Sequence, residues 1–232
     1  MGFKEDIEAE VKGIFRERWD TRDGTVVPES EDLGLGNESV KLEGTVLYAD
    51  ISGSTRMVDT HADNFNFSAE VYKTYLYCAA KIIREENGAI TAYDGDRIMA
   101  VFIGSSKNTS AVRCGLKINY AVQEIINPAL RAQYQNSQFV LKHVVGVDTS
   151  ALWVARTGVR GANDLVWVGR AANYAAKLTE LDAEYPTWIT GTVYNNMLDS
   201  VKLTDGRQMW EPRIWKPMND MSIYRSNWRW KI

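Results

Sequence analysis

Two aspartates stand at the edges of apolar runs, in Tyr48-Ala-Asp50-Ile-Ser-Gly-Ser-Thr55 and in Tyr93-Asp-Gly-Asp96-Arg-Ile-Met-Ala-Val-Phe102. Phosphoryl transfer with two divalent cations needs two carboxylates that are brought together from separate elements. Hard cations such as Mg²⁺ take oxygen ligands, commonly one or two carboxylates together with substrate phosphates. Asp50 and Asp96 are therefore a candidate metal-binding pair. Small residues that leave room for a triphosphate follow the first aspartate: Ser52, Gly53, Ser54 and Thr55.

Each aspartate also has a purely structural interpretation. Asp50 can end a strand, with serines as turn formers after it. Asp94-Gly95 between apolar runs is a strong signal for a plain hairpin. A phosphatase of the Asp-x-Asp type is disfavoured, because residue 52 is serine. The metal interpretation depends on a fold that brings Asp50 and Asp96 to one place.

Composition excludes several classes of protein. The chain has 232 residues, 45% of them hydrophobic and 25% charged, which predicts one globular domain with attachments. A net charge of -3 argues against nucleic acid as a partner. No apolar run approaches ~18 residues and no signal-peptide core is present, which predicts a cytoplasmic protein with no membrane span. Cys78 and Cys114 lack metal-ligand spacing and are interpreted as reduced core residues.

The first 40 residues differ from the rest. Residues 3–19 have the apolar periodicity of an amphipathic helix, and residues 20–40 have the composition of a loop or linker. The chain is therefore divided into an N-terminal helix and linker, 1–40, and a catalytic domain, 41–232. Two alternatives stand for the helix: a dimerisation or docking arm, which could act as a control element, or a brace packed on its own domain.

The pattern of the second part predicts an α+β fold. Its first elements run strand, helix, hairpin, helix, strand, the βαββαβ order of a ferredoxin-like palm with helices on one face of a mostly antiparallel sheet. In that order the first strand and the hairpin lie side by side, so Asp50 and Asp96 are expected at one sheet edge. The expected elements are strands 45–49, 89–93, 97–103, 139–147, 151–156, 165–168 and 187–190, and helices 63–86, 108–126 (limited by Pro128) and 171–181.

Three motifs in this order resemble class III nucleotidyl cyclases over about residues 43–226. They are Asp50-Ile-Ser-Gly-Ser-Thr, Gly95-Asp96-Arg-Ile-Met-Ala-Val-Phe and Gly169-Arg-Ala-Ala-Asn173-Tyr-Ala-Ala-Lys177-Leu. The resemblance implies two Mg²⁺ or Mn²⁺ ions held by Asp50, Asp96 and the carbonyl of Ile51. One ion would lower the pKa of the ribose 3′-hydroxyl and the other would hold the triphosphate. The 3′-oxygen would attack the α-phosphorus, and pyrophosphate would leave.

The same resemblance assigns roles on the last helix and near the C-terminus. Asn173 matches the residue that steadies the ribose. Lys177 stands where arginine is usual, which keeps the charge but loses the planar fork. Lys216 falls near the position of the triphosphate lysine, although the usual glycine beside it is Pro217. Arg97 can contact phosphate or base, or form an exposed salt bridge, as can Arg170.

The positions that select the base depart from the purine cyclases. Ala92 and Val166 occupy them, and neither side chain can hydrogen-bond a purine edge, so the base pocket must be built otherwise. Tyr48, Tyr93 and Trp167 can supply stacking surface or can simply pack in the sheet.

Intact metal aspartates, altered base selectors and a short chain together resemble the pyrimidine cyclases of Pycsar anti-phage systems. This implies a homodimer with shared active sites that makes cyclic UMP from UTP, or cyclic CMP from CTP, to signal to a separate effector. UTP is the favoured substrate. The alternatives are a purine cyclase with an unusual pocket, and a catalytically silent nucleotide-binding regulatory protein. The intact Asp50, Asp96 and Asn173 argue against the silent protein.

Overall fold

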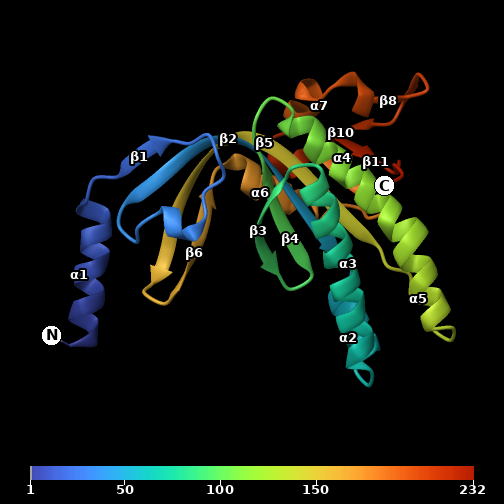
Figure 1. Ribbon diagram of the computed structural model, residues 1–232, viewed down its shortest axis with the longest axis horizontal. Helices are drawn as coiled ribbons and strands as arrows, with labels where there is room; N and C mark the ends of the chain where they lie inside the picture. The colour runs from blue at the N-terminus through green and yellow to red at the C-terminus, as the bar shows by residue number, and fades with distance from the viewer. Residues whose placement is uncertain (1) are drawn as a thin grey trace.

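A nine-stranded sheet runs through the computed structural model, which describes residues 2–232 (Figure 1). Its strand order is β10-β11-β7-β5-β2-β4-β3, with β1 paired to β2 and β6 paired to β5. The strands are β1 (Asp20–Asp23), β2 (Glu38–Ile51), β3 (Ala89–Asp94), β4 (Arg97–Phe102), β5 (His143–Val159), β6 (Ala162–Val168), β7 (Thr187–Thr190), β10 (Glu211–Trp215) and β11 (Met221–Ser226). A small second sheet holds β8 (Leu203–Thr204) and β9 (Arg207–Gln208).

The palm expected from the sequence is confirmed, in the order β2, α3, β3, β4, α4, β5. Antiparallel pairing joins β2 to β4, β3 to β4 and β2 to β5. The helices are α1 (Phe3–Arg16), α2 (Ser54–Thr60), α3 (Phe65–Glu85), α4 (Lys107–Tyr120), α5 (Asn127–Gln133), α6 (Arg170–Leu178) and α7 (Gly191–Asn196). Among residues 2–232, every helix is too short or too polar to span a bilayer.

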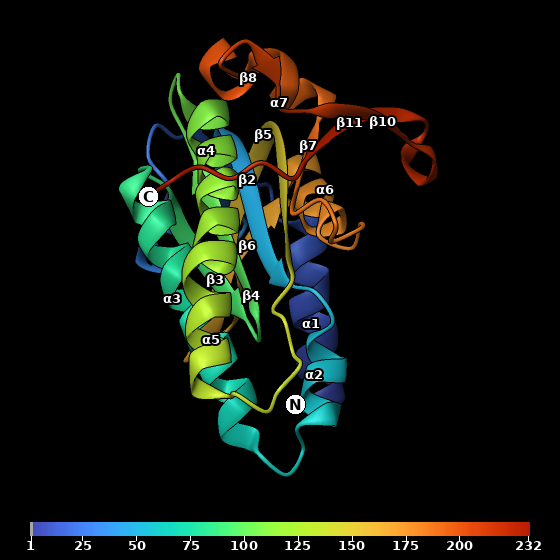
Figure 2. The ribbon, with the colours of Figure 1, turned by 90° about the vertical axis from the view of Figure 1, so that its right-hand side faces the viewer.

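Strand alternation sorts the sheet into two faces. Successive strand side chains point to opposite sides, so Leu47 and Ala49 join the main core under α3 and α4. Val46 and Tyr48 lie on the other face, where the small residues of α6 pack. Figure 2 shows α4 and α6 on opposite sides of β2 and β5. Asp50 follows Val46 and Tyr48 in the same alternation, so its side chain belongs to the face that carries α6.

The helix expected over 108–126 does not end at Pro128. α4 passes into a π-helical segment, Ala121–Ile126, and the chain then continues as α5 to Gln133. Proline lacks the N–H that a helix interior requires. The Asn127 N–H donates to the Val122 carbonyl at the end of the π-helical segment, and Pro128 follows at the start of α5, so the helical backbone continues through it.

The two strands expected at 139–147 and 151–156 are one strand, β5, which begins at His143. The polar residues in its middle predicted an interruption between two strands, but they are hydrogen-bonded inside the sheet. The Thr149 hydroxyl donates to the Gly44 carbonyl at 3.1 Å and also lies 3.0 Å from the Thr45 hydroxyl. A buried hydroxyl with partners is compatible with a central strand.

The expected linker at 20–40 is also wrong in part. β1 pairs in parallel with the start of β2, which itself begins at Glu38. Met1, the first residue of the expected N-terminal segment, lies outside the described residues.

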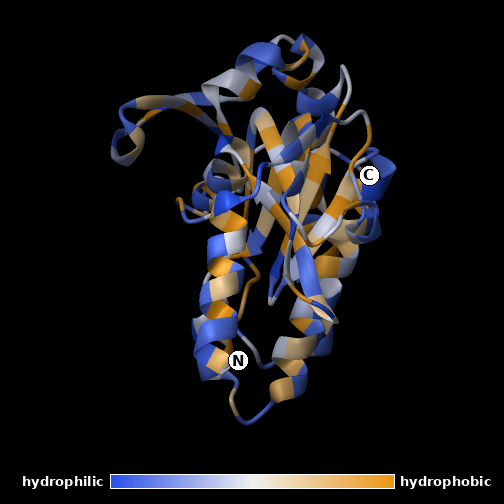
Figure 3. Cartoon of the chain, turned by 90° about the vertical axis from the view of Figure 1, so that its left-hand side faces the viewer, coloured by the Kyte–Doolittle hydropathy of each residue, from blue (hydrophilic) through white to orange (hydrophobic). Residues whose placement is uncertain are grey.

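Helix α1 contains no buried residue, so its interpretation as a brace packed on its own domain is wrong. It stands beside the sheet in Figure 1, and Figure 3 shows both apolar and polar residues along it. The Asn37 amide ties its end to the domain by donating to the Ile14 and Glu17 carbonyls.

Candidate active site

The register of two strands places the candidate metal aspartates together. Asp50 pairs with Arg97 across β2 and β4, and Asp96 is the residue before Arg97. Gly95 and Asp96 form the two-residue turn between β3 and β4, with Gly95 at φ 61°. A positive φ at the first turn residue suits glycine and tightens the hairpin. The turn therefore presents Asp96 beside the end of β2.

Both carboxyl groups carry signs of an unsatisfied site. Burial and the nearby charge of Asp96 raise the pKa of Asp50 to about 6, against the opposing effects of Arg97, the Ile51 N–H and the Thr179 hydroxyl. Asp96 Oδ2 is buried and has no hydrogen-bond partner among the described residues. Two nearby carboxylates, one with an orphaned oxygen, favour a bound cation.

The donor set fits a divalent hard cation. No group of three or more His, Cys, Asp or Glu side chains converges within residues 2–232, so no all-protein cage is present there. Mg²⁺ binds commonly through one or two carboxylates and keeps water and substrate phosphates as its other ligands. Asp50, Asp96 and the backbone carbonyl of Ile51 can supply that number of protein oxygens.

Two buried residues that the sequence did not assign to the site, Tyr75 and His143, lie next to the backbone of Asp50. The Tyr75 hydroxyl lies 3.5 Å from the Asp50 carbonyl oxygen and 3.5 Å from His143 Nδ1. Tyr75 is fully buried. Burial lowers the pKa of His143 to about 3, so its imidazole is neutral. The i, i+4 spacing of Val71, Tyr75 and Ala79 in α3 is the sequence signal that could have placed Tyr75 inside.

The loop after Asp50 leads directly into α2. The Ser52 N–H donates to the Lys142 carbonyl at 2.9 Å, which fixes the loop to the start of β5. Gly53 has φ 74° and precedes α2, so Ser54 and Thr55 lie in the first helical turn. The first N–H groups of a helix have no partner within it and favour negative charge. These residues can therefore face phosphate oxygens.

Helix α6 presents its two expected functional residues to solvent. Asn173 and Lys177 are exposed, and none of the contacts among residues 2–232 joins either side chain to Asp50 or Asp96. Lys177 Nζ lies 4.0 Å from Met218 Sδ in the turn between β10 and β11. Lys216 is exposed in that same turn. The fold thus brings Lys177 and the Lys216 turn to one region, and the end of α6 reaches Asp50 through the Thr179 hydroxyl.

Some of the expected base-pocket residues pack against the sheet, and others are exposed to solvent. Ala92 and Tyr48 are partly buried on the α6 face, where the Arg97 guanidinium lies 5.6 Å from the Tyr48 ring centre. Trp167 packs against this face, which supports the packing interpretation. Tyr93 is 57% exposed, so simple sheet packing is wrong for it.

Val166 is also exposed, on β6. Arg97 forms the salt bridge expected for it, to Asp94 at 2.8 Å.

Arg170 has a structural partner that the sequence did not indicate. It makes a two-point ion pair with Asp148, at 3.0 Å and 3.1 Å, and donates to the Thr149 carbonyl. Asp148 is fully buried and also accepts from the Thr190 hydroxyl at 2.6 Å. Arg170 therefore forms the expected salt bridge, but its acidic partner is buried and not exposed. The pair fixes the start of α6, and with it Asn173.

Comparison with known proteins decides the family. A uridylate cyclase from Xanthomonas perforans is 53% identical over 233 residues, covering 100% of both chains. A uridylate cyclase from Burkholderia cepacia is also 53% identical, over 236 residues and 100% of both chains. The chain belongs to the uridylate cyclase family. It is a nucleotidyl cyclase, and its family supports a pyrimidine substrate.

The fold of this uridylate cyclase family member is that of class III cyclases. The adenylyl cyclase CyaB from P. aeruginosa superposes with a TM-score of 0.64 at 22% identity, covering 82% of this chain and 95% of that one. No family model matches the sequence. The resemblance and the fold class expected from the sequence are both confirmed.

Replacing Asp50 by asparagine should stabilise the metal-free protein above pH 7. Above pH 4 the unfolded chain ionises this carboxyl freely, whereas the folded state resists ionisation up to about pH 6. The wild type therefore loses stability as pH rises towards 6. Allowing for partial solvation, Asp50→Asn should gain about 1 kcal/mol, or ~2–4 °C in melting temperature.

Thermal melting in EDTA between pH 4 and 8 measures this difference. The gain should vanish near pH 4, where the wild-type carboxyl is protonated in both states. A wild type that is more stable than Asp50→Asn at pH 7.5 would contradict the raised pKa of Asp50, to which burial contributes most and Asp96 next.

Replacing Arg170 by glutamine should cost about 2–4 kcal/mol of unfolding free energy, because the buried Asp148 charge loses its partner. Urea unfolding measures the loss, and Arg170→Gln/Asp148→Asn should recover part of it. Arg84→Gln, an exposed arginine of α3, is the matched control and should change stability by less than about 0.5 kcal/mol. An Arg170→Gln effect as small as the control's would show that the pair does not anchor α6.

Proposed function

We propose that this protein converts UTP to 3′,5′-cyclic UMP and pyrophosphate. The observation that carries the proposal is the pair Asp50 and Asp96 at one sheet edge, with an orphaned buried oxygen on Asp96. Full-length identity of 53% to proteins named uridylate cyclase supports the choice of nucleotide.

The reaction is an internal displacement. The ribose 3′-oxygen forms a bond to the α-phosphorus, the bond between that phosphorus and the bridging oxygen breaks, and pyrophosphate leaves with the bond electrons. The 3′-hydroxyl proton passes to solvent water as the new bond forms. Asp50, Asp96 and the Ile51 carbonyl would hold the divalent cations, Mg²⁺ or Mn²⁺. When bound, these cations supply positive charge at the 3′-oxygen and the triphosphate.

The protein's own groups bind and orient the nucleotide. Ser52, Gly53, Ser54 and Thr55 form the phosphate loop, supported by the free N–H groups at the start of α2. Asn173 orients the ribose, and Lys177 meets the negative charge that develops on the reacting phosphate. Lys216 reaches the outer phosphates from the neighbouring turn. Donors preorganised toward such charge are each worth about 3–4 kcal/mol of barrier.

The base side of the pocket favours uracil by its donors. Ala92 and Val166 offer no hydrogen bond to a base. Arg97 lies on the α6 face beside Tyr48, and its guanidinium has donors beyond the one used by Asp94. A guanidinium has only donors. Uracil carries a carbonyl acceptor at position 4, where cytosine carries an amino donor, so Arg97 favours UTP over CTP if its guanidinium faces position 4 of the base.

We further propose a homodimer with two shared active sites. Asn173 and Lys177 are exposed, and neither side chain forms a hydrogen bond or ion pair with Asp50 or Asp96 among residues 2–232. A two-fold pair places the basic helix of one copy over the aspartates of the other, and generates two equivalent sites.

The biological role proposed is defence against phage, in which cyclic UMP activates a separate effector. The cytoplasmic location expected from the sequence stays a prediction.

Product analysis with ATP, GTP, CTP and UTP in Mn²⁺ tests the reaction. UTP should give 3′,5′-cyclic UMP, and Asp50→Ala should abolish it. Asp63→Ala, an exposed aspartate beyond α2, is the matched control and should keep full activity. Cyclic CMP as the main product would overturn the base assignment. A cyclic product that survives in Asp50→Ala would overturn the site.

Mixing Asp50→Ala chains with Asn173→Ala chains should restore activity that neither variant has alone. Each mixed dimer keeps one complete site, and half of the dimers are mixed, so recovery of about a quarter of wild-type activity is expected. Cyclic UMP formation after co-refolding or co-expression measures it. Absence of rescue in confirmed mixed dimers would contradict shared sites.

A further inference from the structure

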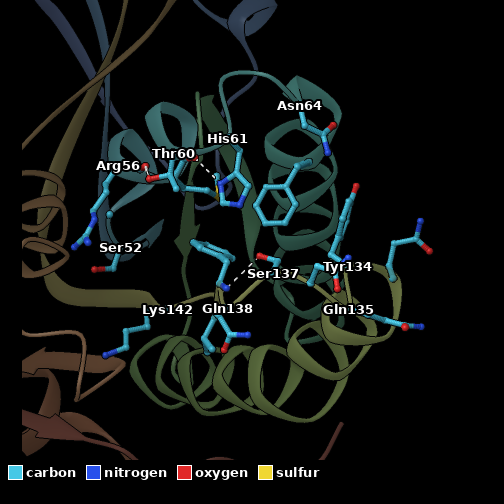
Figure 4. A pocket seen from close by; sticks show the side chains of 17 residues that line it. Ser52, Arg56, Thr60, His61, Asn64, Tyr134, Gln135, Ser137, Gln138 and Lys142 are labelled. Atoms are coloured by element: carbon cyan, nitrogen blue, oxygen red, sulfur yellow. Dashed lines mark hydrogen bonds between the residues drawn. The ribbon is translucent and has the colours of Figure 1, made fainter.

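A cavity of about 1010 Å³ lies between α2, the start of α3 and the segment that joins α5 to β5 (Figure 4). Asp50 and Asp96 do not line it, and of the proposed phosphate loop only Ser52 and Gly53 do. It is therefore a different space from the proposed catalytic centre, although it borders the same loop. Its volume is at the upper end of the range for small-molecule sites.

The charge of the lining selects anions. No aspartate or glutamate lines the cavity, although acidic residues outnumber Lys and Arg in the chain. Arg56 forms no ion pair with any residue in 2–232, and Lys142 pairs with Glu184 at the surface. Figure 4 shows Arg56 and Lys142 on the same side, with Ser52 between them. The uncompensated positive charge, that of Arg56, thus lies at the end next to the proposed phosphate loop.

Aromatic rings form the middle of the cavity. His61 stacks on Phe67 with ring centres 3.8 Å apart and planes 11° apart, and Phe139 meets both rings edge-on. His61 Nδ1 lies 2.9 Å from the Met57 carbonyl oxygen. A carbonyl only accepts, so Nδ1 carries the hydrogen and Nε2 is left free for a ligand. A planar ring can pack against such a cluster.

Amide side chains supply the remaining polar groups. Asn64, Gln133, Gln135 and Gln138 line the cavity, and their side chains make no hydrogen bond to other residues in 2–232. Each amide offers both donors and an acceptor, which suits the mixed edge of a heterocycle. These amides would select a ligand by the shape and hydrogen-bonding edge of its ring, while the cationic end would attract its phosphate.

From these features we propose that the cavity between α2 and the α5–β5 segment binds a phosphorylated heterocycle of nucleoside monophosphate size, at a second site beyond the proposed cyclase function. The phosphate lies at Arg56 beside Ser52, and the ring packs at His61 and Phe139. Because the Ser52 N–H donates to the Lys142 carbonyl, a bound ligand contacts both segments that fix the loop after Asp50.

The two histidines of the chain give a built-in test. His61 lines this cavity, and His143 lies under the proposed catalytic centre through Tyr75. In protein labelled with ¹³C at histidine Cε1, UMP and AMP are titrated in EDTA, and inorganic phosphate is the third probe. One or both nucleotides should shift the His61 resonance saturably below about 10 mM and leave His143 unchanged.

Variants locate the binding. Arg56→Gln should weaken nucleotide binding at least about tenfold, because a charge-assisted hydrogen bond to phosphate is lost. Arg84→Gln is the matched control and should bind as wild type does. Three results would each overturn the proposal: no saturable shift of His61, a shift of His143 alone, or equal binding by Arg56→Gln. Phosphate alone binding as tightly as the nucleotides would also overturn it, since the ring would then contribute nothing.

Discussion

The pairing of β2 with β4 is the constraint on which the active site depends. The register sets Asp50 opposite Arg97, and the tight turn at Gly95 then leaves Asp96 next to Asp50. A slip of one residue would turn every side chain of β2 to the other face of the sheet. That slip is prevented because Leu47 is buried among α3 and α4 while Tyr48 belongs to the opposite face. The hydrophobic core of the palm therefore fixes the separation of two like charges. The repulsion between the two carboxylates lowers the stability of the folded chain, and a bound cation would offset it.

A second constraint holds helix α6. The start of α6 is tied to β5 by the ion pair of Arg170 with buried Asp148. Farther along α6, Tyr174 meets Trp215 edge-on, and Lys177 reaches the turn between β10 and β11. One end of the helix is thus fixed by charge and the other by aromatic packing. Its exposed polar residues can be held in place without being buried, which a substrate site requires.

Local patterns predicted the palm well, because its elements are long and strongly periodic. The order from β2 to β5, the hairpin at Gly95 and the position of the two aspartates could all be derived from the sequence. The hydrogen-bond and ion-pair partners of buried polar groups, which lie far apart in the sequence, could not be derived. Thr149 interrupts the apolar pattern of β5, yet its hydroxyl is paired across the sheet. Pro128 signals a helix end, yet a change of helical form just before it keeps the helix going. The buried partner of Arg170 is 22 positions away in the sequence, which no local pattern encodes.

Several apolar side chains and the candidate site residue Asn173 are exposed in the single chain. Proteins rarely leave large apolar side chains unpartnered in a continuous region, yet Trp153, Val166 and Val168 are all exposed along β5 and β6. Asn173 is exposed on the same chain without a contact to the aspartates. A helix of 14 residues such as α1 is marginal in water on its own, and its apolar stripe is also uncovered. In the proposed homodimer, a second copy would cover these apolar strands and bring Asn173 and Lys177 to the aspartates by the same contact. Association and activity would then depend on one interface.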